Sequence, residues 1–277
     1  MKRVLSAFLL SAVLCTLLVA CGGTPTPAGS TPTPTSAAAP ITLNVFAAAS
    51  LTESFNEIAS TYHQMHPTIT IKPNYNGSQI LEQQIANAAP CDVFASADLT
   101  NMQKASSAGL VNASQVFVKN RLVVIIPVGN PGHITSLKDL ARRGVKIDLE
   151  ASTVPAGKYS RQALANLSKS ADYGSGYGSA VLANVVSQED NVKAVVQKVQ
   201  LGEADAGFVY RTDVTAAVAS KLTVIEIPDP YNVIAQYPIA VAKSSPHATD
   251  AQAFVNFVLS KTGQDIMKKY NFIPVNA

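Results

Sequence analysis

The sequence has few of the residues that carry most enzyme chemistry. It contains three cysteines, four histidines and no tryptophan, and charged residues make up 14% of it. The histidines form no H-E-x-x-H metal motif, and the chain has neither a G-x-S-x-G nucleophile turn nor a glycine-rich phosphate loop. The cysteines show neither a disulfide framework nor a zinc spacing. These absences weigh against an enzyme and against a resident metal or cofactor.

An excess of charge of one sign is also missing. Removal of the leader described below takes away Lys2 and Arg3, so 21 − 2 = 19 basic residues stand against 18 acidic ones. The resulting net charge, near +1, does not favour nucleic acid as a partner.

Residues 1–20 have the layout of a signal peptide. Lys2 and Arg3 precede an apolar stretch, residues 4–20, that ends directly before Cys21. Leu18-Val19-Ala20-Cys21 resembles the bacterial lipobox, and this resemblance implies cleavage before Cys21 and acylation of that cysteine. Several acyl chains would hold the protein outside the cytoplasm, at the cell membrane. The alternative is a transmembrane anchor, but the stretch has only 17 residues and no stop-transfer charges follow it.

The segment after the lipobox is predicted to be a disordered tether. Residues 21–40 are almost entirely Gly, Thr, Pro, Ala and Ser after Cys21, and this composition buries too little apolar surface to offset the entropy of ordering. The remainder, residues 41–277, is long enough for two modest lobes or for one large domain.

Short β-like runs alternate with helical patterns through residues 41–277, which predicts an α/β fold with largely parallel sheets. Leu51, Phe55, Ile58, Tyr62 and Met65 are spaced to form one apolar stripe on the first helix. A valine-striped helix, with valines at 192, 195, 196 and 199, follows near the middle of the chain. Strands are predicted at residues 43–47, 69–72, 93–95, 122–127, 145–149, 206–209, 222–227 and 239–242.

In open α/β sheets, ligands bind beyond the carboxyl ends of the strands, where loops lead into helices. At the first such junction Ser50 is predicted to cap a helix, with Glu53 completing a capping box. At the second junction Ser78 begins a helix directly after Gly77.

Two further junctions lie later in the chain. Pro155 suits the first position of a helix and leaves the amide of Ala156 free behind it. Asp190 or Asn191 caps the valine-striped helix and exposes the amide of Val192. Each helix start is by itself an ordinary cap. Several converging on one cleft would bind an anion without Lys or Arg, because helix starts present unpaired N–H groups and a positive dipole end.

Six segments in order resemble one family, the bacterial periplasmic molybdate-binding proteins, over essentially the whole mature chain. The resemblance rests on Phe46-Ala47-Ala48-Ala49-Ser50-Leu51, Ala89-Pro90-Cys91-Asp92-Val93-Phe94-Ala95-Ser96-Ala97-Asp98, Val154-Pro155-Ala156-Gly157, Asn191-Val192-Lys193, Gly207-Phe208-Val209-Tyr210 and Tyr237-Pro238-Ile239-Ala240. It implies an α/β, two-lobed type II periplasmic binding protein fold with mixed, mostly parallel sheets and a ligand cleft between the lobes. The implied lobes are residues 41–123 plus 236–277 and residues 124–235, with chain crossings near 122–127 and 231–237.

The same resemblance implies the ligand and its contacts. Molybdate or tungstate would be bound as the oxyanion by the hydroxyls of Ser50 and Ser78, the amides of Ala156 and Val192, and the hydroxyl of Tyr210. The sequence departs from the family at Asn76-Gly77-Ser78-Gln79, where a serine-rich run is usual, and at Glu150-Ala151, where Asp-Pro is usual. The second departure is expected to touch a neighbouring loop only. The family further implies a monomer that hands its ligand to an ABC transporter permease, with no cofactor and no catalysis.

Other ligands and roles remain open from the residues alone. A site made only of donors would reject protonated phosphate, whose own O–H would face another donor. Sulfate is the remaining rival, and a ferric ligand is disfavoured because Val209, not a second tyrosine, precedes Tyr210. Tyr210 could instead be a core aromatic. Asp98 is predicted to cap the helix that starts at Leu99, because a carboxylate facing the ligand would repel a dianion.

Overall fold

The computed structural model describes residues 39–275. The predicted signal peptide, Cys21 and nearly all of the predicted tether therefore lie outside the described residues. Residues 39 and 40 have no regular secondary structure and lead into the first strand. Within residues 39–275, no helix has both the length and the apolar character that crossing a membrane requires.

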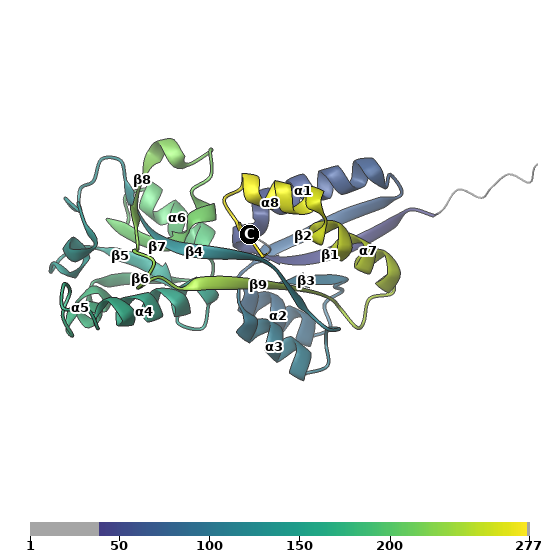
Figure 1. Ribbon diagram of the computed structural model, residues 1–277, viewed down its shortest axis with the longest axis horizontal. Helices are drawn as coiled ribbons and strands as arrows, with labels where there is room; N and C mark the ends of the chain where they lie inside the picture. Colours follow the sequence, from purple (N-terminus) through teal and green to yellow (C-terminus); the bar gives the residue numbers. More distant parts are fainter. Residues whose placement is uncertain (1–38, 276–277) are drawn as a thin grey trace, which may run out of the picture. The chain divides into compact units, whose positions relative to one another are not determined.

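The first sheet is built by strands from both ends of the described chain. Strand β1 (Ile41–Ala48) pairs in parallel with β2 (Ile69–Asn76) and with β3 (Val93–Ala95). The helices associated with it are α1 (Thr52–Met65), α2 (Ser78–Ala86), α3 (Leu99–Ser107), α7 (Ala248–Leu259) and α8 (Lys261–Lys269). Figure 1 shows α1, α7 and α8 on one side of this sheet and α2 and α3 on the other.

The second sheet comes from the middle of the chain. Strand β5 (Ile147–Glu150) pairs in parallel with β6 (Val185–Glu189) and β7 (Ala206–Tyr210). Strand β8 (Leu222–Glu226) and helices α4 (Pro155–Leu167), α5 (Tyr177–Ala183) and α6 (Val192–Gln200) complete this half. At three of the predicted binding junctions, a parallel strand ends and a helix follows: β2 leads into α2, β5 into α4 and β6 into α6.

Two long strands join the halves, and the antiparallel ladders of the described residues all involve one of them. Strand β4 (Gln115–Pro127) pairs with β9 (Ile234–Val241) as far as Arg121, and from Leu122 onward it pairs with β7 and β8. Strand β9 also pairs with β3, and the short β10 (Ile273–Pro274) pairs with β4. The predicted two-lobed α/β architecture is confirmed. The lobe limits at 123/124 and 235/236 fall inside β4 and β9 and stay a prediction.

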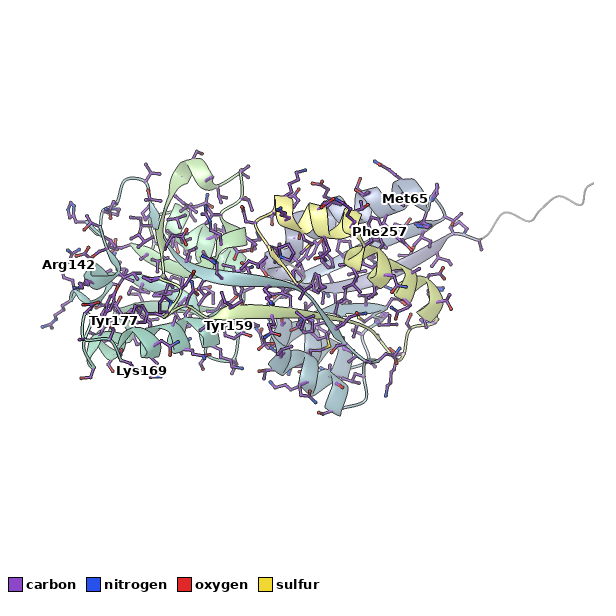
Figure 2. The ribbon with its side chains drawn as sticks, viewed as in Figure 1. Met65, Arg142, Tyr159, Lys169, Tyr177 and Phe257 are labelled. Atoms are coloured by element: carbon purple, nitrogen blue, oxygen red, sulfur yellow. The ribbon has the colours of Figure 1, made fainter. Side chains whose placement is uncertain are left out.

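The apolar stripe predicted for the first helix forms the centre of the core. Phe55, Ile58 and Tyr62 are fully buried, and Phe55 and Tyr62 both meet Phe254 of α7 edge to face. Burying such a side chain contributes about 1.5–3 kcal/mol relative to leaving it exposed. Met65 departs from the prediction: it is 59% exposed and lies at the periphery (Figure 2), because α1 ends there. All four valines of the α6 stripe are buried, as predicted.

Candidate functional site: a neutral cavity between two sheets

The first junction holds Ser50 in a different local structure from the predicted one. Residues Ala49–Leu51 form a 3-10 turn, and α1 begins after it with Leu51 at its N-cap and no side-chain cap. The predicted capping box of Ser50 and Glu53 is therefore wrong, because the 3-10 turn already takes the chain into the helix. Ser50 is 3% exposed and its Oγ lies 2.9 Å from the hydroxyl of Tyr237.

The second junction follows the prediction closely. Strand β2 ends at Asn76, Gly77 is the N-cap and α2 begins at Ser78. The backbone N–H of Ala97 donates to Ser78 Oγ at 2.9 Å. This contact leaves the Ser78 hydroxyl hydrogen available for another acceptor.

The third and fourth junctions are the starts of α4 and α6. Pro155 is the first residue of α4, as predicted, and Ala156 is fully buried behind it. Asn191 rather than Asp190 caps α6: its Oδ1 accepts from the amides of Lys193 and Ala194 at 3.1 and 3.2 Å. Because Asn191 is the N-cap, Val192 is the first residue of α6. The amide of a residue in this position has no partner within its own helix.

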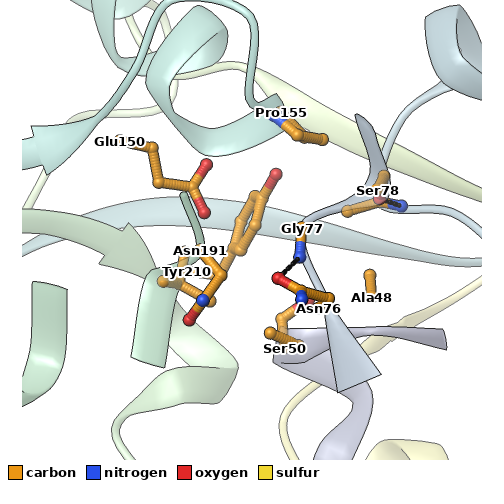
Figure 3. A pocket seen from close by; sticks show the side chains of 12 residues that line it. Ala48, Ser50, Asn76, Gly77, Ser78, Glu150, Pro155, Asn191 and Tyr210 are labelled. Carbon is orange, nitrogen blue, oxygen red and sulfur yellow. Dashed lines mark hydrogen bonds between the residues drawn. The ribbon is translucent and has the colours of Figure 1, made fainter. Parts of the chain in front are cut away.

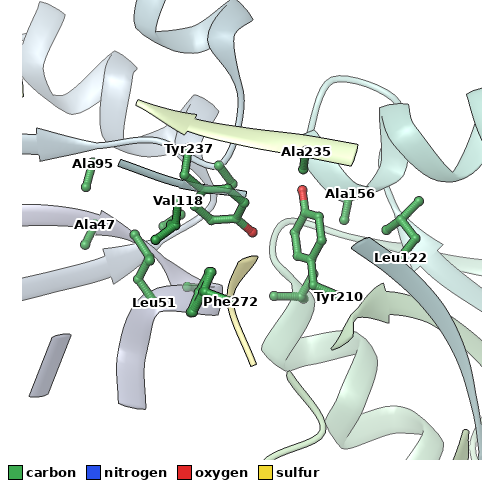
Figure 4. Close-up of a cluster of buried hydrophobic side chains, with 14 of the residues drawn as sticks. Ala47, Leu51, Ala95, Val118, Leu122, Ala156, Tyr210, Ala235, Tyr237 and Phe272 are labelled. Atoms are coloured by element: carbon green, nitrogen blue, oxygen red, sulfur yellow. The ribbon is translucent and has the colours of Figure 1, made fainter. Parts of the chain in front are cut away.

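Tyr210 ends β7 with its hydroxyl inside the protein. The side chain is 1% exposed, and its hydroxyl has no hydrogen-bond partner within the described residues. Its ring meets Tyr237 edge to face, with centroids 5.7 Å apart (Figure 4). A buried hydroxyl without a partner is costly, so this group is positioned for an acceptor that the protein itself does not supply.

These junctions meet at one cavity, seen in Figure 3. The cavity has a volume of about 10 Å³, far below the size of organic-ligand pockets, so only a very small ligand fits it. Its lining contains no Lys, Arg or His. The lining residues are Ala48, Ala49, Ser50, Asn76, Gly77, Ser78, Ala97, Glu150, Pro155, Asn191, Val192 and Tyr210.

Four of the five predicted binding residues, Ser50, Ser78, Val192 and Tyr210, therefore line a single cavity. Ala156 is not in the lining, although Pro155 before it is. The assignment of all five as ligand contacts stays a prediction. The structure brings Glu150 to the cavity as well, which corrects the expectation that this position touches a neighbouring loop only. A signal was present in the sequence, because Glu150 directly follows the predicted strand 145–149 and lies just before the Pro155 junction.

Side chains from the two halves also meet around the cavity. Lys193 of α6 forms an ion pair with Glu53 of α1 at 2.8 Å. Gln79 Nε2 of α2 donates to the backbone oxygen of Asp190 at 3.0 Å, and Lys158 of α4 donates to Thr100 of α3. The described structure thus has its two halves in contact on either side of the cavity.

Asp98 and Cys91, which lie outside the cavity, have structural partners. Asp98 caps α3, as predicted, by accepting from the amide of Asn101 at 2.9 Å. Cys91 is buried, and burial raises the pKa of its thiol to about 12. Among residues 39–275, no three His, Cys, Asp or Glu side chains gather as a metal site would require.

Comparison with known proteins gives a family and several relatives. Residues 43–273 match the family described as bacterial extracellular solute-binding protein. The molybdate-binding protein ModA of Mycobacterium tuberculosis is 35% identical, and the alignment covers 97% of each chain. YvgL of Bacillus subtilis, whose name includes ABC transporter substrate-binding lipoprotein, is 32% identical over 84% of this chain and 86% of that one. A solved substrate-binding domain from Clostridium difficile matches with a TM-score of 0.63 and 32% identity, covering 85% and 99% of the two chains.

The close approach at Gly77 gives a test of the contact between the halves. A Cβ at this position would lie 2.1 Å from the backbone oxygen of Asp190. In Gly77→Ala we expect a crystal structure to show α2 and the start of α6 about 1 Å farther apart, with the Gln79 to Asp190 hydrogen bond lost. Gly129→Ala is the matched control, because its Cβ would meet nothing within 4 Å. An unchanged distance between Gln79 and Asp190 in Gly77→Ala would show that the approach at Gly77 does not determine how close α2 and the start of α6 can come.

Proposed function

Because the chain belongs to the family of bacterial extracellular solute-binding proteins, we propose that it binds molybdate or tungstate and delivers the anion to an ABC importer. The observation that carries this proposal is the small cavity lined by hydroxyls and helix starts without any basic side chain. Neutral donors hold a dianion through charge-assisted hydrogen bonds, which are about twice as strong as neutral ones. A site without a fixed cation also avoids binding too tight for release.

We assign five groups to the oxyanion. The hydroxyls of Ser50, Ser78 and Tyr210 donate from the lining. Ser50 and Ser78 have hydrogen-bonding capacity that their protein partners leave unused, and the Tyr210 hydroxyl has no partner among the described residues. The amides of Ala156 and Val192 donate from the first turns of α4 and α6, where the helix dipoles add positive potential. The metal atom stays inside its shell of oxo groups, so the protein contacts only oxygen.

Closure of the two halves would complete the site. Ser50 and Ser78 belong to junctions of the first sheet, whereas Ala156, Val192 and Tyr210 belong to the second. The joining strands β4 and β9 are the natural hinge, and the contact between Glu53 and Lys193 can form only when the halves meet. The closed form is what a permease would distinguish from the empty protein. We propose a monomer that has no catalytic role and binds no nucleic acid.

Parallel calorimetric titrations with molybdate, tungstate, sulfate and phosphate test the ligand. We expect one molybdate or tungstate per chain and much weaker binding of sulfate and phosphate. At a free concentration about a thousandfold above the dissociation constant, the ligand should stabilise the fold by roughly 4 kcal/mol. Equal thermal shifts with sulfate and molybdate would contradict the selectivity. An absence of binding to all four anions would contradict the function.

Val192→Pro tests the backbone half of the site. Proline removes the amide hydrogen but is tolerated at the first helical position, which Val192 occupies. Loss of one hydrogen bond to a charged ligand is worth about 1.5–3 kcal/mol, so binding should weaken roughly 10- to 150-fold. Val192→Ala is the control, because it shortens the side chain and keeps the amide. If a folded Val192→Pro protein bound molybdate as tightly as Val192→Ala, the Val192 amide would not be a ligand.

We also propose that the mature protein begins at an acylated Cys21 and is held outside the cytoplasm at the cell membrane. The lipobox-like sequence supports this, and a relative whose name includes lipoprotein agrees with it. The substitution Cys21→Ser should abolish acylation of the N-terminus and leave molybdate affinity unchanged. Mass spectrometry of the N-terminus and calorimetric titration measure the two effects, and an unmodified N-terminal Cys21 in the wild type would rule out the anchor.

A further inference from the structure

Glu150 is the one acidic residue among those that line the cavity. It is the last residue of β5, and its side chain is 3% exposed. Figure 3 shows its carboxyl group and the ring of Tyr210 directed toward the same space. A carboxylate in this position would face the doubly charged ligand that the proposed function requires.

The surroundings of Glu150 do not compensate a negative charge. None of the ion pairs among residues 39–275 includes it. The guanidinium of Arg161 is nearby but donates to the backbone oxygen of Glu150 at 2.9 Å. The carboxyl accepts the N–H of Gly157 at Oε2, 3.1 Å away, and the amide of Ala156 also favours the ionised form. Burial outweighs both amides and raises the pKa of Glu150 to about 8.

The charged and titratable neighbours act mostly in the same direction. Asp213, from the turn after β7, and Asp98, at the start of α3, both raise the pKa of Glu150. Tyr210 of β7 is held neutral, because burial raises the pKa of its hydroxyl well above the usual value. On the neighbouring strand β6, Glu189 is neutralised by Lys198 at 2.6 Å. Lys193, which approaches Asp213 at 3.7 Å, is engaged mainly by Glu53.

A dianion in the cavity would add to this effect. Two negative groups cannot share a small, dry space cheaply, whereas a protonated carboxyl can accept from Gly157 at Oε2 and donate from Oε1. The ionised carboxylate, in contrast, would hold the amides at the start of α4 for itself, since the amides of Gly157 and Ala156 both stabilise its charge.

We propose that Glu150 binds the oxyanion only as the neutral acid, donating a hydrogen bond to one ligand oxygen, so that ligand binding takes one proton from solvent whenever Glu150 is ionised in the empty protein. This inference rests on the proposed function and makes Glu150 a sixth contact. It restores a cavity in which the ligand meets donors alone. It also makes release favourable when Glu150 loses its proton.

Calorimetry of the mature protein with molybdate from about pH 6.5 to pH 10 tests this, using pairs of buffers with different ionisation enthalpies. Molybdate itself gains or loses no proton in this range. With a pKa of about 8 in the empty protein, uptake should be about 0.1 proton at pH 7 and about 0.9 at pH 9. Affinity should fall roughly tenfold per pH unit well above pH 8.

Glu150→Gln removes the titration and keeps an N–H donor and a carbonyl acceptor. It should bind molybdate with an affinity that does not change between pH 7 and pH 9, and at pH 9 it should show no proton uptake. Asp148→Asn is the matched control: Asp148 lies on the same strand, burial raises its pKa to about 7, and it is absent from the cavity lining. This variant should keep the wild-type pH profile.

The possible outcomes distinguish a failure of the proposed role of Glu150 from a failure of the proposed oxyanion binding. Failure to bind any of the four oxyanions at any pH contradicts the proposed function. Tight molybdate binding with no proton uptake by the wild type at pH 9 overturns the role of Glu150 and leaves the function intact. A Glu150→Gln protein that keeps the wild-type uptake also overturns it, because another group would carry the proton. If Glu150→Gln does not fold, the wild-type uptake alone decides.

Discussion

Unpaired backbone amides at helix starts are the constraint on which the site depends. Three of the parallel strands lead into a helix at their carboxyl ends: α2 follows β2, α4 follows β5 and α6 follows β6. The first turns of these helices carry N–H groups that have no partner inside the helix. Because the cavity is lined by residues from all three starts, the topology itself creates positive potential there. Basic side chains are not needed.

A buried polar chain ties the cavity to the strands that join the halves. Ser50 Oγ lies 2.9 Å from the Tyr237 hydroxyl, and the Nδ2 of Asn120 lies 3.3 Å from the same hydroxyl and 2.9 Å from Thr212 Oγ1. Tyr237 is on β9 and Asn120 on β4, beside the point where β4 changes its pairing partner. A hinge movement of these strands would therefore change the position of the Ser50 hydroxyl through its hydrogen bond to Tyr237. Satisfied buried networks of this kind favour one arrangement over another.

The sequence patterns predicted the elements that are apolar and missed those that are not. The predicted strand 93–95 agrees residue for residue with β3, and Pro155 and Ser78 begin their helices as expected. The first half of β4 was missed because Lys119, Asn120 and Arg121 interrupt its apolar run. Strand β6 was missed because its pattern, VVSQE, is short and partly exposed. Both strands are held by pairing with neighbours far away in the sequence, which local patterns do not contain.

The candidate site shows the same division between local and tertiary information. Helix starts and their caps are local, so their positions could be predicted, and the choice between Asp190 and Asn191 needed only the geometry of one turn. Ser50 was mistaken for a cap because its real partner, Tyr237, is 187 positions away. Glu150 is an intermediate case. Its position between a predicted strand and the Pro155 junction is local information, but its place in the cavity lining depends on contact between the two halves.

The contacts that close the cavity are themselves weak, and this sets what must hold the halves together. The ion pair between Lys193 and Glu53 is partly exposed, and such pairs contribute little to stability. Gly77, in contrast, allows backbone contact with Asp190 that any larger residue would block. The contacts between the two halves therefore permit the closed arrangement but contribute little free energy that favours it. The free energy that favours the closed form must then come from whatever satisfies the buried donors, above all the unpartnered hydroxyl of Tyr210.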